Sequence, residues 1–329
     1  MKGTDINRLM QRYEGAVPGA SLLVIRDGKP VLQRSYGRAN LEKDVPATAA
    51  TNYRLASVTK QFTAAAVLLL VEEGKLGLED RVRTWLPSLP VAVEAVTIRQ
   101  MLTHRAGLVD YEDLMAEDYP GQVRDADVLR LLEAEPRTYF SPGSRYRYSN
   151  SGYALLALIV ERVSGRSFLR FLRERIFAPL AMHDTLAYVR GGPEIARRAY
   201  GYSLIDGRWT RTDQSATSAV LGDGGIYSSA LDLAKWDAAL YDNRLLGEQA
   251  RRLAFKPWTP TDAPNVAYGF GWRITGDSVW HSGETIGFRN VILRYPKRRL
   301  TVILLTNRDD PEPYGTALAI AESYRAAHD

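Results

Sequence analysis

The hydrophobic pattern of the chain changes twice, and this constrains its fold more than any other feature. Near the start, Ser21–Ile25 and Val31–Tyr36 flank an Asp-Gly turn and predict an antiparallel hairpin. From Ser57 onward the apolar residues recur at three- and four-residue spacing, which predicts helices. Short β-branched and aromatic runs return near the end. Because lone hairpins cannot bury their apolar faces, we expect both ends to share one antiparallel sheet.

The spacing also predicts individual elements. Helices are expected at residues 6–13, from 57 to about 74, and at 98–102, 125–133, 153–164, 168–177, 229–241 and 313–327. Late strands are expected at residues 268–274, 278–281, 288–295 and 300–306. We therefore predict an α+β fold, an antiparallel sheet flanked by helices with an inserted, mainly helical domain. Residues 1–54 and 265–329 would form the sheet domain and residues 55–264 the helical domain, with the active site in the cleft between them.

Composition excludes several classes of function. The chain has 329 residues, with 43 Lys and Arg against 38 Asp and Glu, and the +5 excess forms no basic-aromatic motif. We therefore expect no nucleic-acid partner. The absence of cysteine excludes disulfides, thiol catalysis and cysteine metal sites. With no H-E-x-x-H, P-loop or G-x-G-x-x-G motif, and the wrong spacing at 222–225 for a phosphate loop, we expect no metal and no cofactor.

The N-terminal segment lacks the pattern of a secretory signal. Such a signal needs roughly 7–15 uninterrupted apolar residues, and polar residues interrupt this segment from Asp5 to Arg12. The apolar run Ala64–Val71 is too short to cross a bilayer. The chain as given is therefore predicted to be cytoplasmic without a membrane partner, or periplasmic or secreted if a signal was removed.

The tetrapeptide Ser57-Val-Thr-Lys60 is the first candidate for chemistry. The i, i+3 spacing places Ser57 and Lys60 about one helical turn apart on the same face. A serine hydroxyl is a poor nucleophile unless a base takes its proton, and a buried lysine can be that base. The helix N-terminus adds N–H groups that can face a developing oxyanion. The alternative is a serine cap beside a surface lysine.

Two further sequence elements indicate a catalytic site only when they are considered together with the first. Tyr148-Ser-Asn150 pairs a phenol that can move a proton with an amide that can bind a carbonyl or the lysine. His281-Ser-Gly283 ends a predicted strand, and its glycine permits close approach of a substrate backbone. Each alone is also explained as a turn or a strand end.

The order and spacing of the three elements resemble the signature of penicillin-recognising serine hydrolases, S-x-x-K, a Tyr-x-Asn element and a Lys-Thr-Gly-like strand. The chain is similar to the serine β-lactamase and penicillin-binding protein superfamily. Its Tyr-x-Asn form resembles the branch of class C β-lactamases, D,D-carboxypeptidases, D-aminopeptidases and β-lactamase-like esterases. Segments 97–108, 224–234 and 269–272 also resemble that branch, so the similarity covers nearly the whole chain.

The resemblance implies a β-lactamase/transpeptidase-like fold and assigns roles to the three elements. Ser57 would be the nucleophile, Lys60 its activating partner and Tyr148 the general base, although Lys60 and Tyr148 both remain candidates for taking the serine proton. The substrate would be bound by Asn150, His281, Ser282, Gly283 and Glu284. The backbone N–H groups of Ser57 and Glu284 would form the oxyanion hole.

Two departures from the family pattern concern charge. Histidine stands at 281 where many β-lactamases have lysine, and its ordinary pKa of about 6.5 assures no positive charge at neutral pH. Glu284 adds an acid beside the expected carboxylate-binding strand. We therefore expect anionic penicillins to bind poorly, with improvement at lower pH as His281 gains a proton. Arg289 could offset both changes.

The sequence thus predicts a serine acyl-hydrolase for small esters, amides or peptides. A class C-like β-lactamase or D,D-carboxypeptidase is the first alternative, and a non-catalytic penicillin-binding sensor is the second. No oligomeric state is predicted.

Overall fold

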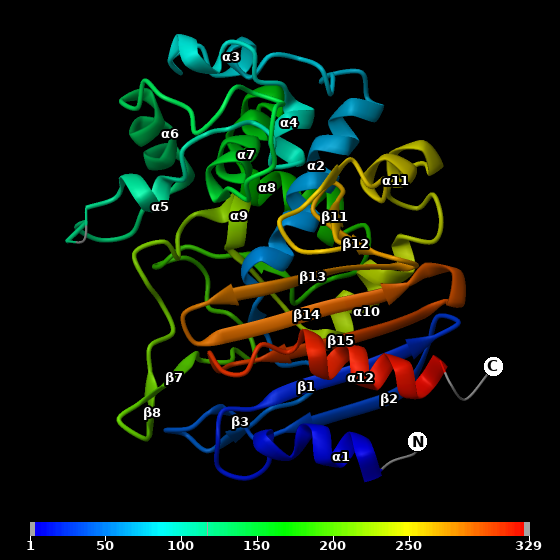
Figure 1. Ribbon diagram of the computed structural model, residues 1–329. Coiled ribbons are helices and arrows are strands. Elements are labelled where there is room, and N and C mark those ends of the chain that lie inside the picture. Colours follow the sequence, from blue (N-terminus) through cyan, green and yellow to red (C-terminus); the bar gives the residue numbers. More distant parts are fainter. Residues whose placement is uncertain (1–3, 117, 326–329) are drawn as a thin grey trace.

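The computed structural model describes residues 4–116 and 118–325. Its main feature is one antiparallel sheet in the order β10-β11-β12-β13-β14-β15-β1-β2 (Figure 1). The strands are β1 (Ala20–Arg26), β2 (Lys29–Tyr36), β10 (Thr259–Pro260), β11 (Ala267–Tyr268), β12 (Arg273–Thr275), β13 (Ser278–Thr285), β14 (Phe288–Tyr295) and β15 (Leu300–Thr306). Strand β1 pairs with β15 over its whole length, so both ends of the chain share the sheet as predicted.

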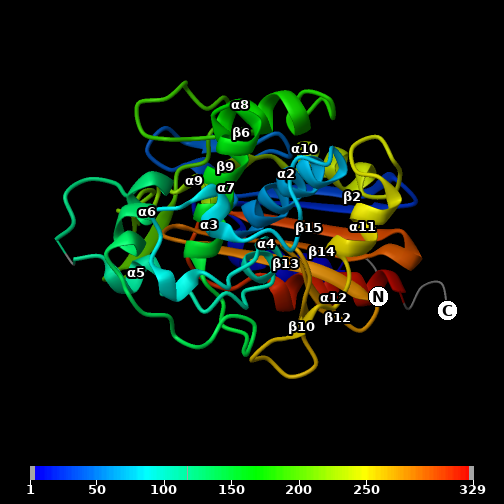
Figure 2. The ribbon, with the colours of Figure 1, turned by 90° about the horizontal axis from the view of Figure 1, so that it is seen from above.

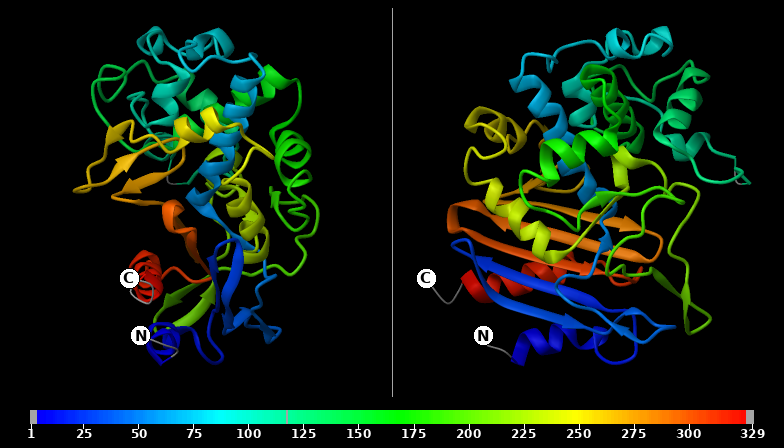
Figure 3. Two further views of the ribbon diagram at one scale, coloured as in Figure 1. Left: turned by 90° about the vertical axis from the view of Figure 1, so that its right-hand side faces the viewer. Right: turned by 180° about the vertical axis from the view of Figure 1, so that it is seen from behind.

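Both faces of the sheet are covered because successive residues of its central strands are buried, and their side chains point alternately to the two faces. One face, with Leu22 and Val302, packs against α1 (Thr4–Met10) and α12 (Tyr314–Arg325). The other face, with Leu23 and Ile303, packs against α10 (Ala230–Ala239) and the helical part. Figure 2 shows α10 and α12 on opposite sides of the sheet, and the side view in Figure 3 shows the same layers.

The middle of the chain is mainly helical. Its remaining helices are α2 (Lys60–Glu72), α3 (Val82–Trp85), α4 (Ile98–Leu102), α5 (Tyr111–Leu114), α6 (Asp125–Glu133), α7 (Asn150–Ser164), α8 (Phe168–Leu172), α9 (Leu221–Gly224) and α11 (Glu248–Ala254). Its short strands are β3 (Arg38–Asn40), β4 (Val45–Pro46), β5 (Tyr53–Arg54), β6 (Leu186–Ala187), β7 (Tyr202–Ile205), β8 (Arg208–Arg211) and β9 (Ile226–Ser228). These strands form three small sheets, β3-β4, β5-β9-β6 and β7-β8.

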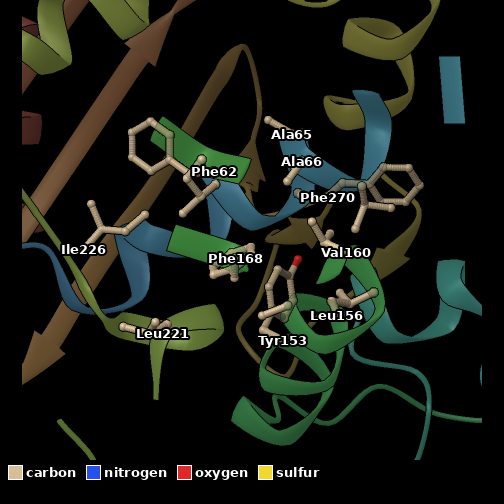
Figure 4. Close-up of a cluster of buried hydrophobic side chains, with 14 of the residues drawn as sticks. Phe62, Ala65, Ala66, Tyr153, Leu156, Val160, Phe168, Leu221, Ile226 and Phe270 are labelled. Atoms are coloured by element: carbon tan, nitrogen blue, oxygen red, sulfur yellow. The ribbon is translucent and has the colours of Figure 1, made fainter. Parts of the chain in front are cut away.

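Helix α2 is the centre of the helical part. Its residues from Lys60 to Leu70 are all buried, and Figure 4 shows Phe62 and Ala66 of α2 among side chains of α7 such as Leu156 and Val160. A helix that is apolar all round must lie inside a protein. The buried position of α2 therefore holds the 3-10 turn just before it, which carries Ser57, against the sheet.

Most predicted elements are present, but some bounds differ. The helix expected from Ser57 begins with a 3-10 turn, η2 (Ala56–Thr59), before α2. Residues 6–13 divide between α1 and the 3-10 turn η1 (Gln11–Tyr13), and residues 168–177 between α8 and the π-helical turn η4 (Arg173–Phe177). The predicted last residues of the closing helix, 326–327, lie outside the described residues.

The single strand predicted at 268–274 is wrong. Strands β11 and β12 are separated by a sharp bend, and Gly271 in that bend has a φ of 75°. A Cβ at Gly271 would lie 2.6 Å from the carbonyl oxygen of Lys60, so only glycine lets the bend pass over α2. The sheet also takes in β10, which begins before residue 265, the expected start of the second sheet segment.

Candidate active site

Ser57 lies where the small central sheet leads into α2. Strand β5 pairs with β9 and ends at Arg54, two residues before the first residue of the 3-10 turn η2. Ala56 in that turn has a φ of 50°, a left-handed conformation that costs a non-glycine residue about 1 kcal/mol or more. Such strain persists only where the surrounding structure enforces it, and here it directs the chain into Ser57.

Lys60 is completely buried and its ammonium nitrogen has three acceptors. Lys60 Nζ lies 2.9 Å from Ser57 Oγ, 2.8 Å from Asn150 Oδ1 and 3.0 Å from the backbone carbonyl oxygen of Asp223. Asn150 and Asp223 can therefore take two N–H bonds in either charge state of the amine. The third position faces Ser57 Oγ, which accepts a proton from an ammonium or donates one to a neutral amine.

Tyr148 lies beside this group with its ring rather than its hydroxyl. The ring centroid of Tyr148 is 4.9 Å from Lys60 Nζ and 4.2 Å from the ring of His104. The backbone N–H of Ser149 donates to His104 Nδ1 at 3.1 Å, which ties the Tyr148 segment to the buried histidine. Lys60 is thus the group in hydrogen-bond contact with Ser57, whereas Tyr148 forms the wall next to Lys60.

Asn150 is held at the first residue of α7 by acidic side chains. Its backbone N–H donates to Asp110 Oδ2 at 2.7 Å, and its side-chain amide donates to Glu112 Oε1 at 3.0 Å. An aspartate that accepts from the first N–H groups of a helix stabilises its N-terminus. This bond explains why α7 begins at Asn150 and not at the predicted Tyr153.

Strand β13 passes directly against the turn that carries Ser57. A Cβ at Gly283 would lie 2.0 Å from the carbonyl oxygen of Leu55 and 3.2 Å from the backbone nitrogen of Ser57. The space that this glycine leaves is filled by the protein's own backbone, not reserved for a substrate as the sequence suggested. The close packing brings the backbone at Gly283 next to the nitrogen of Ser57, one of the two N–H donors of the predicted oxyanion hole. The other predicted donor, Glu284, is the next residue of β13.

His281 is buried and uncharged. Its Nδ1 lies 2.6 Å from the carbonyl oxygen of Ser282, so Nδ1 carries the proton, and Nε2 accepts from the Tyr268 hydroxyl at 2.9 Å. Burial, followed by the charges of Arg273 and Lys60, lowers the pKa of His281 well below its usual value. The expectation that His281 gains a proton at mildly acidic pH is therefore wrong.

Glu284 is paired rather than free. Its carboxylate lies 2.8 Å from Arg289 Nη2, and Arg289 also donates to the carbonyl oxygens of Thr285 at 2.7 Å and Phe288 at 3.0 Å. Because Glu284 is 69% exposed, this pair contributes little to stability but offsets the charge of the acid locally. Arg289 is thus committed to the end of β13.

A small hollow of about 50 Å³ opens beside Ser57. Its lining includes Asn150, Thr217 and Glu284, together with Arg54, Glu112 and Asp223, three residues that the sequence motifs did not identify. His281 and Ser282 lie outside that lining. Glu112 had no sequence signal, whereas Asp223 stands in the Gly222–Gly225 stretch that was considered only as a phosphate loop.

Asp223 is the most perturbed acid of the site. Its carboxyl is buried and accepts from the Tyr111 hydroxyl at 3.0 Å. Burial raises its pKa to about 8, although the charge of Lys60 acts in the opposite direction. Much of the Asp223 population therefore keeps its proton at neutral pH, so this carboxyl is no strong counter-ion for Lys60.

The described residues contain neither a metal-binding cluster nor a membrane-spanning helix. No group of three or more histidine, cysteine, aspartate or glutamate side chains within 4–116 and 118–325 could hold a metal ion. Over the same ranges, every helix is too short or too polar to cross a membrane.

Known proteins resemble the chain over almost its whole length. Penicillin-binding protein 4* of Bacillus subtilis (strain 168) is 32% identical over 323 residues, which cover 92% of this chain and 71% of that protein. The chain spans a smaller share, 60%, of further relatives from Staphylococcus aureus. The octameric penicillin-binding protein homologue from Pyrococcus abyssi has a TM-score of 0.86 and 28% identity, over 98% of this chain and 76% of that one.

A D-amino acid amidase from Ochrobactrum anthropi SV3, solved with L-phenylalanine amide, has a TM-score of 0.83. It is 27% identical, and the match covers 98% of this chain and all of the amidase chain. These structures confirm the predicted α+β, β-lactamase/transpeptidase-like fold. A family model described as Beta-lactamase matches residues 6–326. The chain belongs to this Beta-lactamase family, in the superfamily of penicillin-binding proteins and D-amino acid amidases.

Proposed function

We propose that this protein is a serine hydrolase that forms an acyl-enzyme on Ser57. The observation that carries the proposal is the 2.9 Å contact between Lys60 Nζ and Ser57 Oγ inside a buried, fully hydrogen-bonded arrangement. A nucleophile within hydrogen-bond reach of a base that is itself held by other groups is the arrangement of nucleophilic catalysis. The family to which the chain belongs is one of serine hydrolases.

In the proposed reaction, the hydroxyl proton of Ser57 moves to a neutral Lys60 while Oγ forms a bond to the substrate carbonyl carbon. The oxyanion is stabilised by the N–H groups of Ser57 and Glu284. The bond to the leaving group then breaks, and that group takes a proton from the Lys60–Tyr148 side. Water repeats the sequence on the acyl-enzyme and releases the acid.

We further propose small neutral or cationic esters, amides or peptides as substrates. The hollow beside Ser57 is lined by the carboxyls of Glu112, Asp223 and Glu284 and by the guanidinium of Arg54. Much of Asp223 keeps its proton and Glu284 is paired with Arg289, so Glu112, which holds the side-chain amide of Asn150, is the acid most able to repel a substrate carboxylate. A carboxylate placed close to Ser57 would meet like charge, which costs on the order of 1 kcal/mol when partly buried. The relative solved with an amino acid amide supports an amide substrate for this chain.

A panel of four substrate classes tests the proposal: nitrophenyl esters, D-amino-acid amides, a chromogenic cephalosporin and a D-alanyl-D-alanine peptide. Nitrophenyl esters and D-amino-acid amides should be turned over with a higher kcat/KM than a chromogenic cephalosporin. Glu112→Gln should narrow that difference, because it removes a negative charge while keeping a partner for Asn150. Cephalosporin as the preferred substrate would favour the class C-like β-lactamase, and a D-alanyl-D-alanine peptide would favour the D,D-carboxypeptidase. Stable acylation of Ser57 without turnover of any of them would favour the sensor.

A further inference from the structure

A second hollow, of about 320 Å³, is formed by residues of segments 188–198 and 211–214. We call it the arginine hollow, because its lining includes Arg190, Arg198 and Arg211, together with Tyr188 and Thr212. Its residues come from the loop after β6, the stretch before β7, and the end of β8, which Figure 1 shows below α9 at one end of the sheet. Its volume is in the range of small-ligand sites, which is roughly 300–1,000 Å³.

The arginine hollow carries an excess of positive charge. Arg198 pairs with Asp213 at 2.6 Å, and Arg211 forms an ion pair with Glu42. Arg190 is exposed and forms no ion pair with any of the residues 4–116 and 118–325. Three guanidinium groups thus face two carboxylates, which leaves one positive charge for a ligand.

The guanidinium of Arg198 is also positioned rather than mobile. Its Cζ lies 4.9–5.3 Å from the ring centroids of Tyr188, Tyr200 and Tyr227. Its Nε is buried and has no hydrogen-bond partner within the described part of the chain. Arginine held between aromatic rings is the group that proteins use to bind planar carboxylates.

Neighbouring residues of one chain segment line the arginine hollow and the hollow beside Ser57. Residues 212–214 line the first, Thr217 lines the second, and Ser218 accepts a hydrogen bond from Arg54 in the second. Tyr227 joins them as well, because its hydroxyl accepts from Arg198 at 3.3 Å while its backbone pairs with Arg54. A substrate arm that leaves Ser57 along segment 212–218 would reach the arginines.

We propose that the arginine hollow binds a carboxylate on a flexible arm of the substrate, while the scissile bond lies at Ser57. This inference rests on the proposed function. It adds that the effect of a substrate carboxylate depends on how far the carboxylate lies from the scissile bond. A carboxylate near Ser57 is disfavoured by Glu112, whereas one at the end of a longer arm is favoured. Arg190 supplies the unpaired charge and Arg198 the fixed geometry.

Paired esters test this position dependence. Each pair is a nitrophenyl ester with an acyl chain that ends in a methyl group or in a carboxylate, measured at increasing chain length and low salt. A second series carries the carboxylate on the alcohol. In one series, kcat/KM for the carboxylate member should fall below its neutral partner at short length and exceed it by about fivefold at a longer one. No such crossover in either series would overturn the proposal.

Two variants assign the effect to the hollow. Arg190→Gln should remove the gain for the long carboxylate arm, whereas Arg208→Gln, an exposed arginine on β8 outside the lining, should keep it. Arg198→Lys, which keeps the charge beside Asp213, should reduce the gain because lysine lacks the planar fork. A gain that survives both Arg190→Gln and Arg198→Lys would contradict the proposal.

Binding of glutarate separates this inference from the proposed function. Calorimetry on Ser57→Ala protein needs no turnover, so it remains valid even if no ester is hydrolysed. Adding Arg190→Gln should weaken glutarate binding about fivefold, and added salt should weaken it further. Equal glutarate binding with and without Arg190→Gln would overturn the proposal that the arginine hollow binds a carboxylate, but it would not bear on the acylation of Ser57. Inorganic phosphate that competes with glutarate would show a general anion site at the same arginines.

Discussion

At the scale of single residues, Lys60 is the group on which the site depends. Its three acceptors come from Ser57, from the start of α7 and from the backbone beside Asp223. Because a buried ammonium without partners costs several kcal/mol, these contacts both stabilise Lys60 and direct it at Ser57. Removing any one of these acceptors should therefore lower the reactivity of Ser57, even where the acceptor itself does not touch the substrate.

Lys60 and Tyr148 should behave as one proton-transfer unit. The ring centroid of Tyr148 lies 4.9 Å from Lys60 Nζ, and Lys60 Nζ in turn contacts Ser57 Oγ. Effects of residues that act as a unit are far from additive. The double variant Lys60→Ala/Tyr148→Phe should thus lose little more kcat/KM on a nitrophenyl ester than the worse single variant. Losses that multiply would show that the two residues act independently.

The sequence predicted those site residues that can be recognised from their near neighbours in the chain. Ser57 and Lys60 are linked by helical spacing, and Tyr148 and Asn150 stand in one short segment. Glu112 and Asp223 were not predicted as site residues, because their contacts join distant parts of the chain. For example, 163 residues separate Lys60 from Asp223. The charge state of His281 could not be predicted from the sequence for a different reason. Its pKa depends on burial, which no single-residue pattern reveals.

At the scale of elements, the packing of β13 on the Ser57 turn is the critical contact. Gly283→Ala would place a methyl group 2.0 Å from the carbonyl oxygen of Leu55, so strand and turn must separate. We expect a loss of about 1–3 kcal/mol in the free energy of unfolding, as for other overpacked sites. Activity should fall further, because the separation moves Glu284 away from Ser57.

Gly315→Ala is the matched control for this change. Gly315 lies in α12 with no atom within 4 Å of a built Cβ, and alanine is a better helix former than glycine. Its variant should be as stable as the parent or more so in urea unfolding. Equal stability and activity for Gly283→Ala would show that the strand does not need this close approach.

Element types were predicted well where the spacing was long and regular. Strands β14 and β15 match their predicted residues because each is rich in β-branched, aromatic or other large apolar residues and is bounded by a polar turn. The bend between β11 and β12 was missed, since the need for glycine there comes from the carbonyl of Lys60 on another element. The early start of α7 was missed for the same kind of reason, because Asp110 supplies its cap.

At the scale of the whole molecule, the buried acids should make stability depend on pH. The pKa of Asp223 is raised to about 8, so the folded protein keeps a proton that the unfolded chain has already lost. The free energy of unfolding should therefore fall by about 1 kcal/mol from about pH 7 to about pH 9. Buried histidines have little effect in this window, because they are then neutral in both states.

Asp223→Asn should reduce that pH dependence. Asparagine retains an acceptor for the Tyr111 hydroxyl, and the backbone carbonyl that binds Lys60 is unchanged. Asp206→Asn, at an exposed turn between β7 and β8, should leave the dependence as it is. Urea unfolding at several pH values measures both. An unchanged slope in Asp223→Asn would mean that its carboxyl is already ionised at neutral pH.

The overall architecture followed from the sequence because it depends on pattern rather than on detail. β-like ends and a helical middle permit few ways to bury all apolar faces, and the shared sheet is one of them. The division into residues 1–54, 55–264 and 265–329 stays a prediction, since α10 and β10 join the sheet layers from within the middle segment. The two hollows that we propose to select the substrate could not be predicted, because contacts between distant segments create them.

The most direct test of the account is intact-mass spectrometry after reaction with a fluorophosphonate, followed by peptide mapping. The account predicts a single adduct on the peptide that contains Ser57, together with a fall in ester turnover of about 10⁴–10⁶-fold in a folded Ser57→Ala variant. That variant should form no adduct. An adduct on another residue, or ester turnover that survives Ser57→Ala, would contradict the assignment of Ser57 as the nucleophile.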